Sequence, residues 1–307
     1  MSYSNSIIFG PIPSRRFGIS LGVDLSPGKK QCNFDCLYCE LEGAKTVDKM
    51  DESPSVSEII SAIKENLEKH SKIDVITLTA NGEPTLYPKL DELVEEIDKI
   101  KGNIKTLILS NGSTIYKKNI FNTLLKIDTV KLSLDCISEK CFKKLDRTNS
   151  SVEIEKIVPA MCAFSKQTKN DLVLEVLFVK DLNDKEDEIS LLYKSILQIN
   201  PKRIDIGTID RPPAYNVKPV SYEFLENIAE KFRNLNINIV HKNRPKSIQF
   251  FSKDEIITML KRRPLTKEDV ENMFDDQSKK ILENLIKNKI VSIINSSGVD
   301  FYKCLCK

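Results

Sequence analysis

Short apolar runs alternate with amphipathic segments along most of the chain. Seven runs are rich in β-branched residues and apolar on both faces, like buried strands of a parallel sheet: Ile19–Leu25, Asp74–Thr79, Thr106–Leu109, Val130–Leu134, Leu172–Val179, Arg203–Thr208 and Asn236–Val240. Six segments between them have the periodicity of amphipathic helices: Val56–Glu68, Leu90–Ile100, Lys117–Lys126, Val152–Phe164, Lys185–Ile199 and Tyr222–Asn234. This alternation predicts βαβ units with right-handed crossovers. We therefore expect an α/β fold built as a partial (β/α)6 barrel, with its chemistry in loops at the carboxyl ends of the strands.

The alternation ends near Asn243–Pro245, and a different pattern follows. Three helical segments and a β-hairpin are predicted for the rest of the chain: Lys253–Arg262, Thr266–Phe274, Ser278–Asn288, and Ile290–Ile294 with Val299–Leu305. They predict a small winged helix-turn-helix-like domain over residues 244–307, after a core over residues 1–243. Its third helix carries Lys279, Lys280 and Lys287, enough for a few phosphate contacts. A docking or dimerisation module is an equally good interpretation of this domain.

The composition is that of an ordinary globular protein and excludes several classes. Hydrophobic residues make up 40% and charged residues 30% of the 307 positions, which argues against a disordered chain, a collagen or a coiled coil. The net charge of +3 does not by itself indicate a polyanionic partner. No apolar run approaches the ~18–20 residues of a membrane span, and the first residues lack the pattern of a secretory signal. We expect a cytoplasmic protein without membrane contact.

Three of the eight cysteines fall within one short segment, QCNFDCLYCE, directly after the first predicted strand. In a chain without an export signal thiols stay reduced, so a tight group of cysteines favours a metal site over disulfides. The thiolates of Cys32, Cys36 and Cys39 can bind three irons of a [4Fe–4S] cluster and leave the fourth iron open to a small molecule. Structural zinc is the competing metal, but it needs four ligands, and the sequence has no second CxxC or HxxxH pair.

The other five cysteines are scattered along the chain. Cys304 and Cys306 alternate on a predicted strand and therefore share one face. We expect Cys304 and Cys306 to be ordinary reduced thiols. A second cluster, formed by Cys304 and Cys306 together with Cys136 or Cys141, is the alternative.

The segment CNFDCLYC resembles the CxxxCxxC signature of the radical S-adenosylmethionine (radical SAM) enzymes, including the aromatic residue before the last cysteine. The resemblance extends over about residues 7–240. Thr79–Pro84, with the sequence TANGEP, resembles the family segment that binds the amino group of SAM, which implies a place at the SAM site for Asn81, Gly82 and Glu83. A glycine there lets the backbone approach a ligand, although a simple turn has the same sequence pattern.

The next strands end in short polar segments, SNG and SLD, that fit the same resemblance. These segments are similar to family positions that contact the ribose and the carboxylate of SAM, so the resemblance implies contacts from Asn111 and Ser133. It also implies that the backbone of Tyr38 lies near the adenine of SAM. Arg211, after the sixth predicted strand, is expected to contact the substrate or the SAM carboxylate.

Two further strings resemble one group within this family. GPIPSRRFG at Gly10–Gly18 and TIDRPPA at Thr208–Ala214 are similar to the wyosine-type tRNA-modifying synthases and their bacterial relatives of undefined substrate. Those synthases have extra cysteines before the triplet, whereas none precedes Cys32 here. Arg15 and Arg16 either hold a phosphate or carboxylate of a ligand or pair with carboxylates at the base of the barrel.

The resemblance implies an enzyme with a [4Fe–4S] cluster and SAM as cofactors. Reductive cleavage of SAM would produce a 5′-deoxyadenosyl radical that modifies a substrate, with tRNA or another nucleic acid as a candidate. The electron would come from a donor such as flavodoxin or ferredoxin. The alternative is an iron–sulfur redox sensor that binds DNA through the C-terminal domain. The segments NGEP and SLD at successive strand ends disfavour it, because a sensor needs no SAM site.

Overall fold

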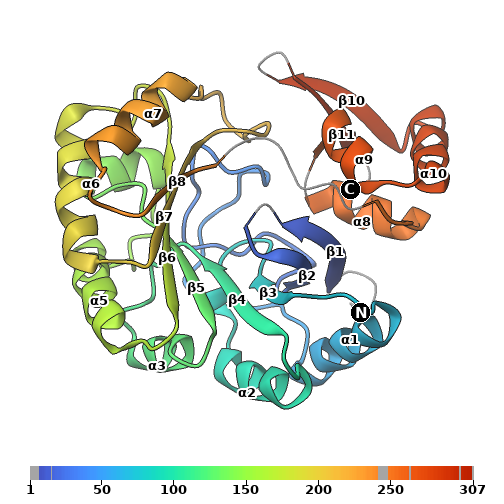
Figure 1. Cartoon of the computed structure of the whole chain (residues 1–307), viewed down its shortest axis with the longest axis horizontal. Coiled ribbons are helices and arrows are strands. Elements are labelled where there is room, and N and C mark those ends of the chain that lie inside the picture. Colours follow the sequence, from blue (N-terminus) through green and yellow to red (C-terminus); the bar gives the residue numbers. More distant parts are fainter. Residues whose placement is uncertain (1–6, 15, 241–247, 263, 297–298, 306–307) are drawn as a thin grey trace.

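The computed structural model describes residues 7–14, 16–240, 248–262, 264–296 and 299–305. Its larger part is an eight-stranded sheet whose strands follow one another in sequence order and curve into an open barrel (Figure 1). β1 (Ile8–Ser14) pairs antiparallel with β2, and all other neighbouring strands pair in parallel. The parallel strands are β2 (Gly18–Asp24), β3 (Val75–Thr79), β4 (Lys105–Ser110), β5 (Thr129–Ser133), β6 (Asp171–Phe178), β7 (Arg203–Thr208) and β8 (Ile237–Ile239). Their carboxyl ends therefore lie at one rim of the barrel.

Helices follow the first six parallel strands and cover the outer face of the sheet (Figure 1). They are α1 (Val56–Lys69), α2 (Leu90–Ile100), α3 (Lys118–Leu124), α5 (Ile154–Gln167), α6 (Glu186–Ile199) and α7 (Tyr222–Lys231). A short helix, α4 (Glu139–Cys141), and a π-helical turn (Phe142–Asp146) lie between β5 and α5. Within the described ranges, every helix is too short or too polar to cross a bilayer.

The strands alternate their side chains between the helices and the inside of the barrel. On β5, Val130 and Leu132 are fully buried in the main apolar core, whereas Lys131 between them lines the inner cavity. Glu175 on β6 and Asp205 on β7 occupy corresponding inward positions, and both contact Lys131. The outer layer thus supplies the apolar packing, and the inner positions carry polar chemistry.

All seven predicted strands and all six predicted helices of this part are present, and the expected α/β fold with a mostly parallel sheet is confirmed. Six strand–helix units run from β2 to α7, as a (β/α)6 arrangement requires, and β8 follows them. The sequence pattern does not predict β1, because its segment contains Pro11 and Pro13, which have no N–H for a central ladder. The structure has β1 at the edge of the sheet, where proline is tolerated.

Residues 248–305 of the described chain form a smaller unit with its own apolar core. Its elements are α8 (Lys253–Arg262), β9 (Leu265–Thr266), α9 (Lys267–Met273), α10 (Asp276–Lys287), β10 (Val291–Ser296) and β11 (Val299–Cys304). The strands form an antiparallel sheet in the order β10-β11-β9, so the predicted hairpin is present and gains a third strand. This unit lies against β1 (Figure 1), where Ile12 packs on its core and the Gln249 side chain donates to the Pro11 carbonyl at 2.5 Å.

Candidate functional site

The three clustered cysteines lie on the loop that follows β2, at the carboxyl rim of the barrel. Gln31 fixes the start of this loop, because its N–H donates to the Asn81 carbonyl at 2.9 Å and its carbonyl accepts from the Glu83 N–H at 3.0 Å. Its side-chain amide also donates to Ser26 Oγ at 2.7 Å. The loop is thereby joined to the segment that follows β3.

A second set of contacts holds the middle of the loop. The N–H groups of Asp35 and Leu37 donate to the carbonyls of Asp146 and Leu145 at 3.0 and 2.9 Å. These bonds attach the loop to the π-helical turn between β5 and α5. The cysteine loop is therefore held from two sides by segments that are distant from it in sequence.

The thiols of Cys32, Cys36 and Cys39 are unpaired and half-buried. Cys32 Sγ lies 3.7 Å from the amide nitrogen of Asn111, and Cys36 Sγ lies 3.5 Å from Asp146 Oδ1. Burial raises the pKa of the Cys32 thiol to about 12 and raises the pKa of the other two above their ordinary value. Such thiols keep their protons until a metal cation compensates the thiolate charge, which suits a metal-binding set.

The segment after β3 contains a glycine and a glutamate with clear structural roles. Gly82 has φ +139°, and a Cβ at this position would lie 1.9 Å from the carbonyl oxygen of Gln31, so only glycine permits the contact. The buried Glu83 carboxylate accepts hydrogen bonds from Ser110 Oγ and the Asn111 N–H, both at 2.7 Å. Burial raises the pKa of Glu83, and hydrogen bonds, first among them that of Thr85, oppose this shift. Glu83 thus joins the ends of β3 and β4 beside the cysteine loop.

Tyr38 and Ser133 lie at the same rim. The Tyr38 hydroxyl donates to the Asp135 carboxylate, which also accepts from the Leu177 N–H at 2.7 Å. Burial raises the pKa of Asp135 to about 7. Ser133 ends β5 and pairs in register with Glu175 of β6. Tyr38 is therefore fixed to the strand ends through its hydroxyl.

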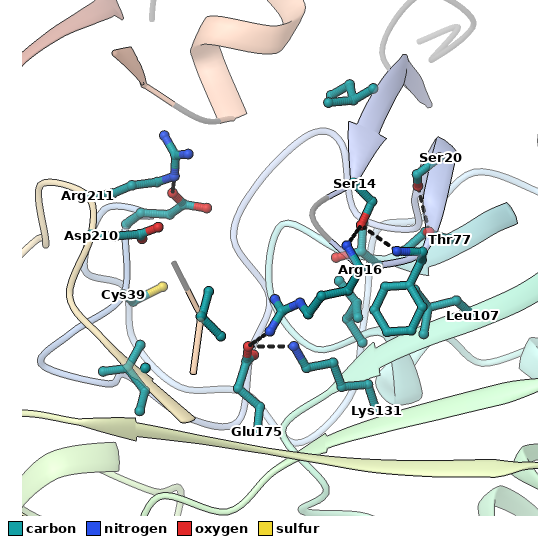
Figure 2. A pocket seen from close by; sticks show the side chains of 18 of the residues that line it. Ser14, Arg16, Ser20, Cys39, Thr77, Leu107, Lys131, Glu175, Asp210 and Arg211 are labelled. Carbon is teal, nitrogen blue, oxygen red and sulfur yellow. Dashed lines mark hydrogen bonds and ion pairs between the residues drawn. The ribbon is translucent and has the colours of Figure 1, made fainter. Parts of the chain in front are cut away.

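A cavity of about 520 Å³ occupies the barrel and reaches the cysteine loop (Figure 2). Tyr38, Cys39 and Asn81 line it at the rim. Its inner wall is partly apolar, with Leu107 and Leu109 of β4 among the lining residues. The volume falls within the range of about 300–1,000 Å³ that is common for small-molecule sites.

Four charged side chains meet inside the barrel, and three of them, Arg16, Lys131 and Glu175, line this cavity. Lys131 Nζ lies 2.5 Å from Glu175 Oε1 and 3.3 Å from Asp205 Oδ2, and Arg16 contacts the same two carboxylates at 3.2 and 2.9 Å. Burial alone would raise the pKa of both acids, but Lys131 and Arg16 hold both values below the ordinary range. Arg16 therefore matches the second interpretation given above, pairing with carboxylates inside the barrel. Arg15 lies outside the described residues.

Lys131, Glu175 and Asp205 are not among the site residues predicted from the sequence. A signal for them is present, because each is a charged residue within an otherwise apolar strand, as in LVLEVLF around Glu175. In a barrel the inward positions of such strands face the cavity, where paired charges are tolerated.

Arg211 follows β7 and joins three parts of the molecule. Its Nε lies 3.4 Å from Glu40 Oε2, and its Nη2 lies 3.5 Å from Asp269 Oδ2 at the start of α9. Its Nη1 donates to the Pro264 carbonyl. Figure 2 shows Arg211 at the rim, on the same side of the cavity as Cys39. Arg211 thus lies where the cysteine loop meets the C-terminal unit, and its contact with SAM or substrate stays a prediction.

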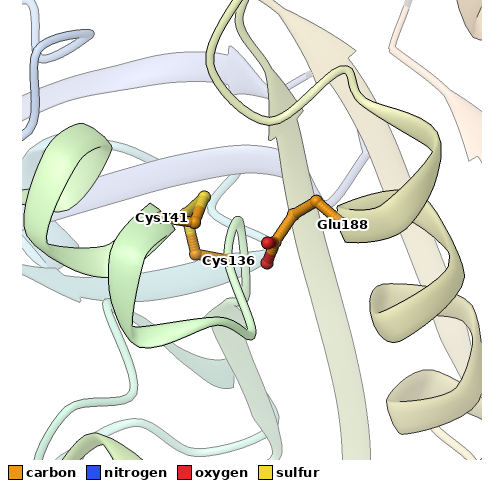
Figure 3. A group of neighbouring side chains, drawn as sticks. All are labelled: Cys136, Cys141 and Glu188. Atoms are coloured by element: carbon orange, nitrogen blue, oxygen red, sulfur yellow. A yellow bond between two sulfur atoms is a disulfide. The ribbon is translucent and has the colours of Figure 1, made fainter.

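Two of the scattered cysteines are paired. Cys136 and Cys141 form a disulfide with Cα atoms 5.5 Å apart (Figure 3). The expectation of reduced thiols is therefore wrong for these two, because the turn that begins α4 at Ser138 brings them together. Cys304 lies in the apolar core of the C-terminal unit, away from this pair, and Cys306 lies outside the described residues.

Comparison with known proteins identifies the family. The family model for the radical SAM superfamily matches residues 29–192, which contain the cysteine loop and strands β3 to β6. The chain belongs to the radical SAM superfamily. It is an enzyme of the radical SAM class, as the sequence analysis predicts.

Relatives of this radical SAM enzyme include a "UPF0026 protein" from Helicobacter pylori, 40% identical over 299 residues that cover 96% of this chain and 97% of the relative. A probable dual-specificity RNA methyltransferase from Exiguobacterium sibiricum is 22% identical over 223 residues, 65% of this chain and 60% of the relative. The solved structure of Streptococcus suis SuiB bound to S-adenosylmethionine matches with a TM-score of 0.51 and 18% identity, over 69% of this chain and 45% of that chain. None of these similarities favours the DNA-binding regulator.

Proposed function

We propose that Cys32, Cys36 and Cys39 bind a [4Fe–4S] cluster and that the enzyme uses it with SAM to modify an RNA substrate. The observation that carries this proposal is the set of three unpaired thiols on one clamped loop, which opens onto the barrel cavity at Cys39. The similarity to SuiB, whose structure holds S-adenosylmethionine, supports SAM as the second ligand.

The donor set fits such a cluster. Three thiolates satisfy three of the four irons, and the open iron can take a small ligand. The remaining cysteines of the described chain lie on other elements, Cys162 on α5 and Cys304 on β11, or in the disulfide. Structural zinc would need a fourth ligand beside the three thiolates, and the cysteine loop carries no fourth cysteine and no histidine.

The residues around the loop position the cofactors. Gly82 allows the segment after β3 to approach the cysteine loop, and Glu83 holds the ends of β3 and β4 together through its hydrogen bonds. Asn111 places its amide nitrogen beside the sulfur of Cys32. We assign SAM binding to the segment and rim residues Tyr38, Asn81, Gly82, Glu83, Asn111, Ser133 and Arg211.

The barrel cavity is the proposed place of reaction. When bound, the cluster and SAM supply a 5′-deoxyadenosyl radical after one-electron reduction by a donor such as flavodoxin or ferredoxin. Leu107 and Leu109 give the cavity an apolar wall, while Lys131 and Glu175 offer polar groups that can orient a substrate.

The C-terminal unit is the proposed RNA-contacting part. Its order of elements, helix, strand, two helices and two strands, supports a winged helix-turn-helix-like domain, to which we assign residues 244–307 beside a core of residues 1–243. Lys279 is paired with Glu271 at 2.6 Å, so Lys280 and Lys287 of α10 are the better candidates for phosphate contacts. The similarity to an RNA methyltransferase supports RNA as the substrate class.

Anaerobic reconstitution tests the cofactor assignment. The wild-type protein is expected to hold about four irons and four sulfides per chain and to form 5′-deoxyadenosine from SAM after reduction. Cys36→Ala is expected to lose both properties, whereas Cys162→Ala, which removes a free thiol on α5, keeps them. Bound zinc without sulfide in the wild-type protein would contradict the proposal.

Deletion of the gene tests the RNA assignment. Mass spectrometry of tRNA and rRNA nucleosides from the deletion strain is expected to show the loss of one modified nucleoside. Complementation with the wild-type gene restores it, and complementation with the Cys36→Ala gene does not. An unchanged set of nucleosides would exclude these RNAs as substrates.

A further inference from the structure

The sulfur of Cys32 accepts two N–H hydrogen bonds. The backbone N–H of Phe34 donates to Cys32 Sγ at 3.4 Å, and the side-chain amide of Asn111 donates to the same sulfur at 3.7 Å. The first bond lies within the cysteine loop, whereas the second comes from the segment after β4. Cys36 has a different neighbour, because its sulfur lies 3.5 Å from Oδ1 of Asp146. The first cysteine of the triplet is thus joined to a side-chain donor that is distant in sequence.

The orientation of the Asn111 amide follows from its contacts with Ser113. The Ser113 N–H donates to Asn111 Oδ1 at 3.0 Å, and the Ser113 hydroxyl donates to the same oxygen at 2.5 Å. Because a backbone N–H can only donate, the amide atom on this side must be the oxygen. The amide nitrogen therefore lies on the side of Cys32, with two hydrogens to donate.

Asn33, inside the cysteine motif, completes a ring of three side chains. Its Oδ1 accepts one hydrogen of the Asn111 amide at 2.9 Å, and its Nδ2 donates to the Ser113 hydroxyl at 2.7 Å. Asn33 and Ser113 are 3% and 0% exposed, so bulk water does not compete for these bonds. The ring fixes the Asn111 amide and leaves its second hydrogen for the sulfur of Cys32.

We propose that Asn111 donates an N–H···S hydrogen bond to Cys32 in the iron–sulfur site, which raises the reduction potential of the bound cluster. Asn33 and Ser113 are the positioning residues that orient this amide. The inference rests on the proposed function. Reduction adds one electron from the external donor to the cluster, with no bond broken and no proton taken up. The negative charge of the cluster rises, and the positive end of an N–H dipole at a sulfur ligand stabilises the reduced state more than the oxidised one.

A redox titration of the reconstituted protein without SAM, followed by electron paramagnetic resonance, measures the potential. Asn111→Ala is expected to lower the equilibrium constant for cluster reduction about tenfold, which corresponds to a potential about 59 mV more negative for one electron. This variant keeps the backbone N–H that donates to Glu83. Ser113→Ala is expected to lower the constant about threefold, because the Ser113 N–H still holds Asn111 Oδ1. Ser113→Thr keeps the hydroxyl and is expected to stay near the wild-type potential.

Asn149→Ala is the matched control. The Asn149 amide also holds the loop that follows β2, but it donates to Thr46 Oγ1 at 3.1 Å and not to a sulfur. This variant should keep the wild-type potential. A difference in potential reports the amide itself, because every variant retains the charged groups near the cysteines, Lys30, Glu40, Glu83, Asp135 and Asp146.

Isotope labelling of asparagine gives a second measurement, which does not depend on stability. The protein is produced with asparagine that carries ¹⁵N in its side-chain amide, and the reduced cluster is studied by pulsed electron paramagnetic resonance. Wild type is expected to show a ¹⁵N coupling. Asn111→Ala should lose this coupling, and Asn149→Ala should keep it.

The outcomes separate this inference from the proposed function. A wild-type protein that assembles no cluster overturns both. A wild-type cluster without the ¹⁵N coupling overturns the hydrogen bond alone, whatever the variants do. Equal potentials in wild type and Asn111→Ala overturn the effect on the potential. Where Asn111→Ala retains no cluster, Ser113→Ala and Ser113→Thr decide this effect, and equal potentials in those two variants overturn it together with the positioning role of Ser113.

Discussion

Inside the barrel, single charged residues are stabilised by one another. The Asp205 side chain has no exposed surface, and it contacts Arg16, Lys131 and Arg203 and accepts a hydrogen bond from Asn238 at 2.9 Å. A buried carboxylate of this kind is tolerated only while its partners remain, because removing one member leaves the others uncompensated. The loss of any one of these side chains is therefore expected to destabilise the others.

Asp205→Asn is expected to lower the free energy of unfolding by about 3 kcal/mol near pH 7, because it removes one of the two carboxylates that Lys131 and Arg16 share and leaves only Glu175 to compensate both cations. Despite burial, the cations hold the pKa of Asp205 below its ordinary value of about 3.9, so its charge stabilises the fold above that pH. The stabilisation is lost as the pH falls through the lower value of the folded state. Urea unfolding at several pH values measures this effect.

The difference between wild type and Asp205→Asn should therefore shrink as the pH falls below about 4. Asp98→Asn is the control, because Asp98 is 70% exposed in its ion pair with Lys101 and should contribute less than about 1 kcal/mol. A difference for Asp205→Asn that stays constant down to acid pH would contradict the assignment of a charged Asp205.

At the scale of elements, the contact between the cysteine loop and the segment after β3 is the critical one. Gly82→Ala is expected to break it, because the new Cβ would lie 1.9 Å from the Gln31 carbonyl oxygen. We expect loss of most bound iron after reconstitution together with a lower melting temperature. Iron analysis and thermal unfolding measure these effects.

Gly102→Ala separates the steric clash from backbone strain. Gly102 also has a positive φ, +56°, but a Cβ there meets no atom within 4 Å. Gly102→Ala should lower the free energy of unfolding by about 1 kcal/mol and leave the iron content unchanged. Equal iron loss in both variants would show that the Gln31 contact is not the cause.

Periodicity predicts the strands and helices because their burial follows from the local sequence. Periodicity does not predict β1, because Pro11 and Pro13 interrupt the pattern. This strand can form only because it lies at the edge of the sheet. The Cys136–Cys141 disulfide depends on a turn that the spacing does not reveal.

At the scale of the whole molecule, Arg211 connects the barrel with the C-terminal unit. Its contacts with Asp269 and the Pro264 carbonyl cross the junction between them, whereas its contact with Glu40 lies within the barrel part. Arg211→Ala is expected to weaken this junction, because the Asp269 carboxylate, which also accepts a hydrogen bond from the Thr266 N–H at the start of α9, loses its cationic partner Arg211. Hydrogen exchange should increase at least threefold in β9 and the first turn of α9, with little change in β3 to β6.

Arg233→Ala is the matched control. The Arg233 side chain is 75% exposed, and its ion pair is with Glu230, three residues earlier in α7. It should leave exchange in β9 and α9 at the wild-type level. Unchanged exchange in Arg211→Ala would show that the contacts of β1 with the C-terminal unit, made by Ile12 and Pro11, hold the junction without Arg211.

The two outermost strands of the described sheet, β1 and β8, are not hydrogen-bonded to each other, yet Phe9 from one edge and Val240 beside the other line the same cavity. A closed ring of strands would admit a long polymer only at its rim or by threading an end through it. A barrel whose edge strands β1 and β8 are not paired can also be entered between these two edges. For the RNA substrate proposed above, a nucleotide in the middle of a folded strand would enter and leave between these two edges, and no end of the strand would have to pass through the barrel.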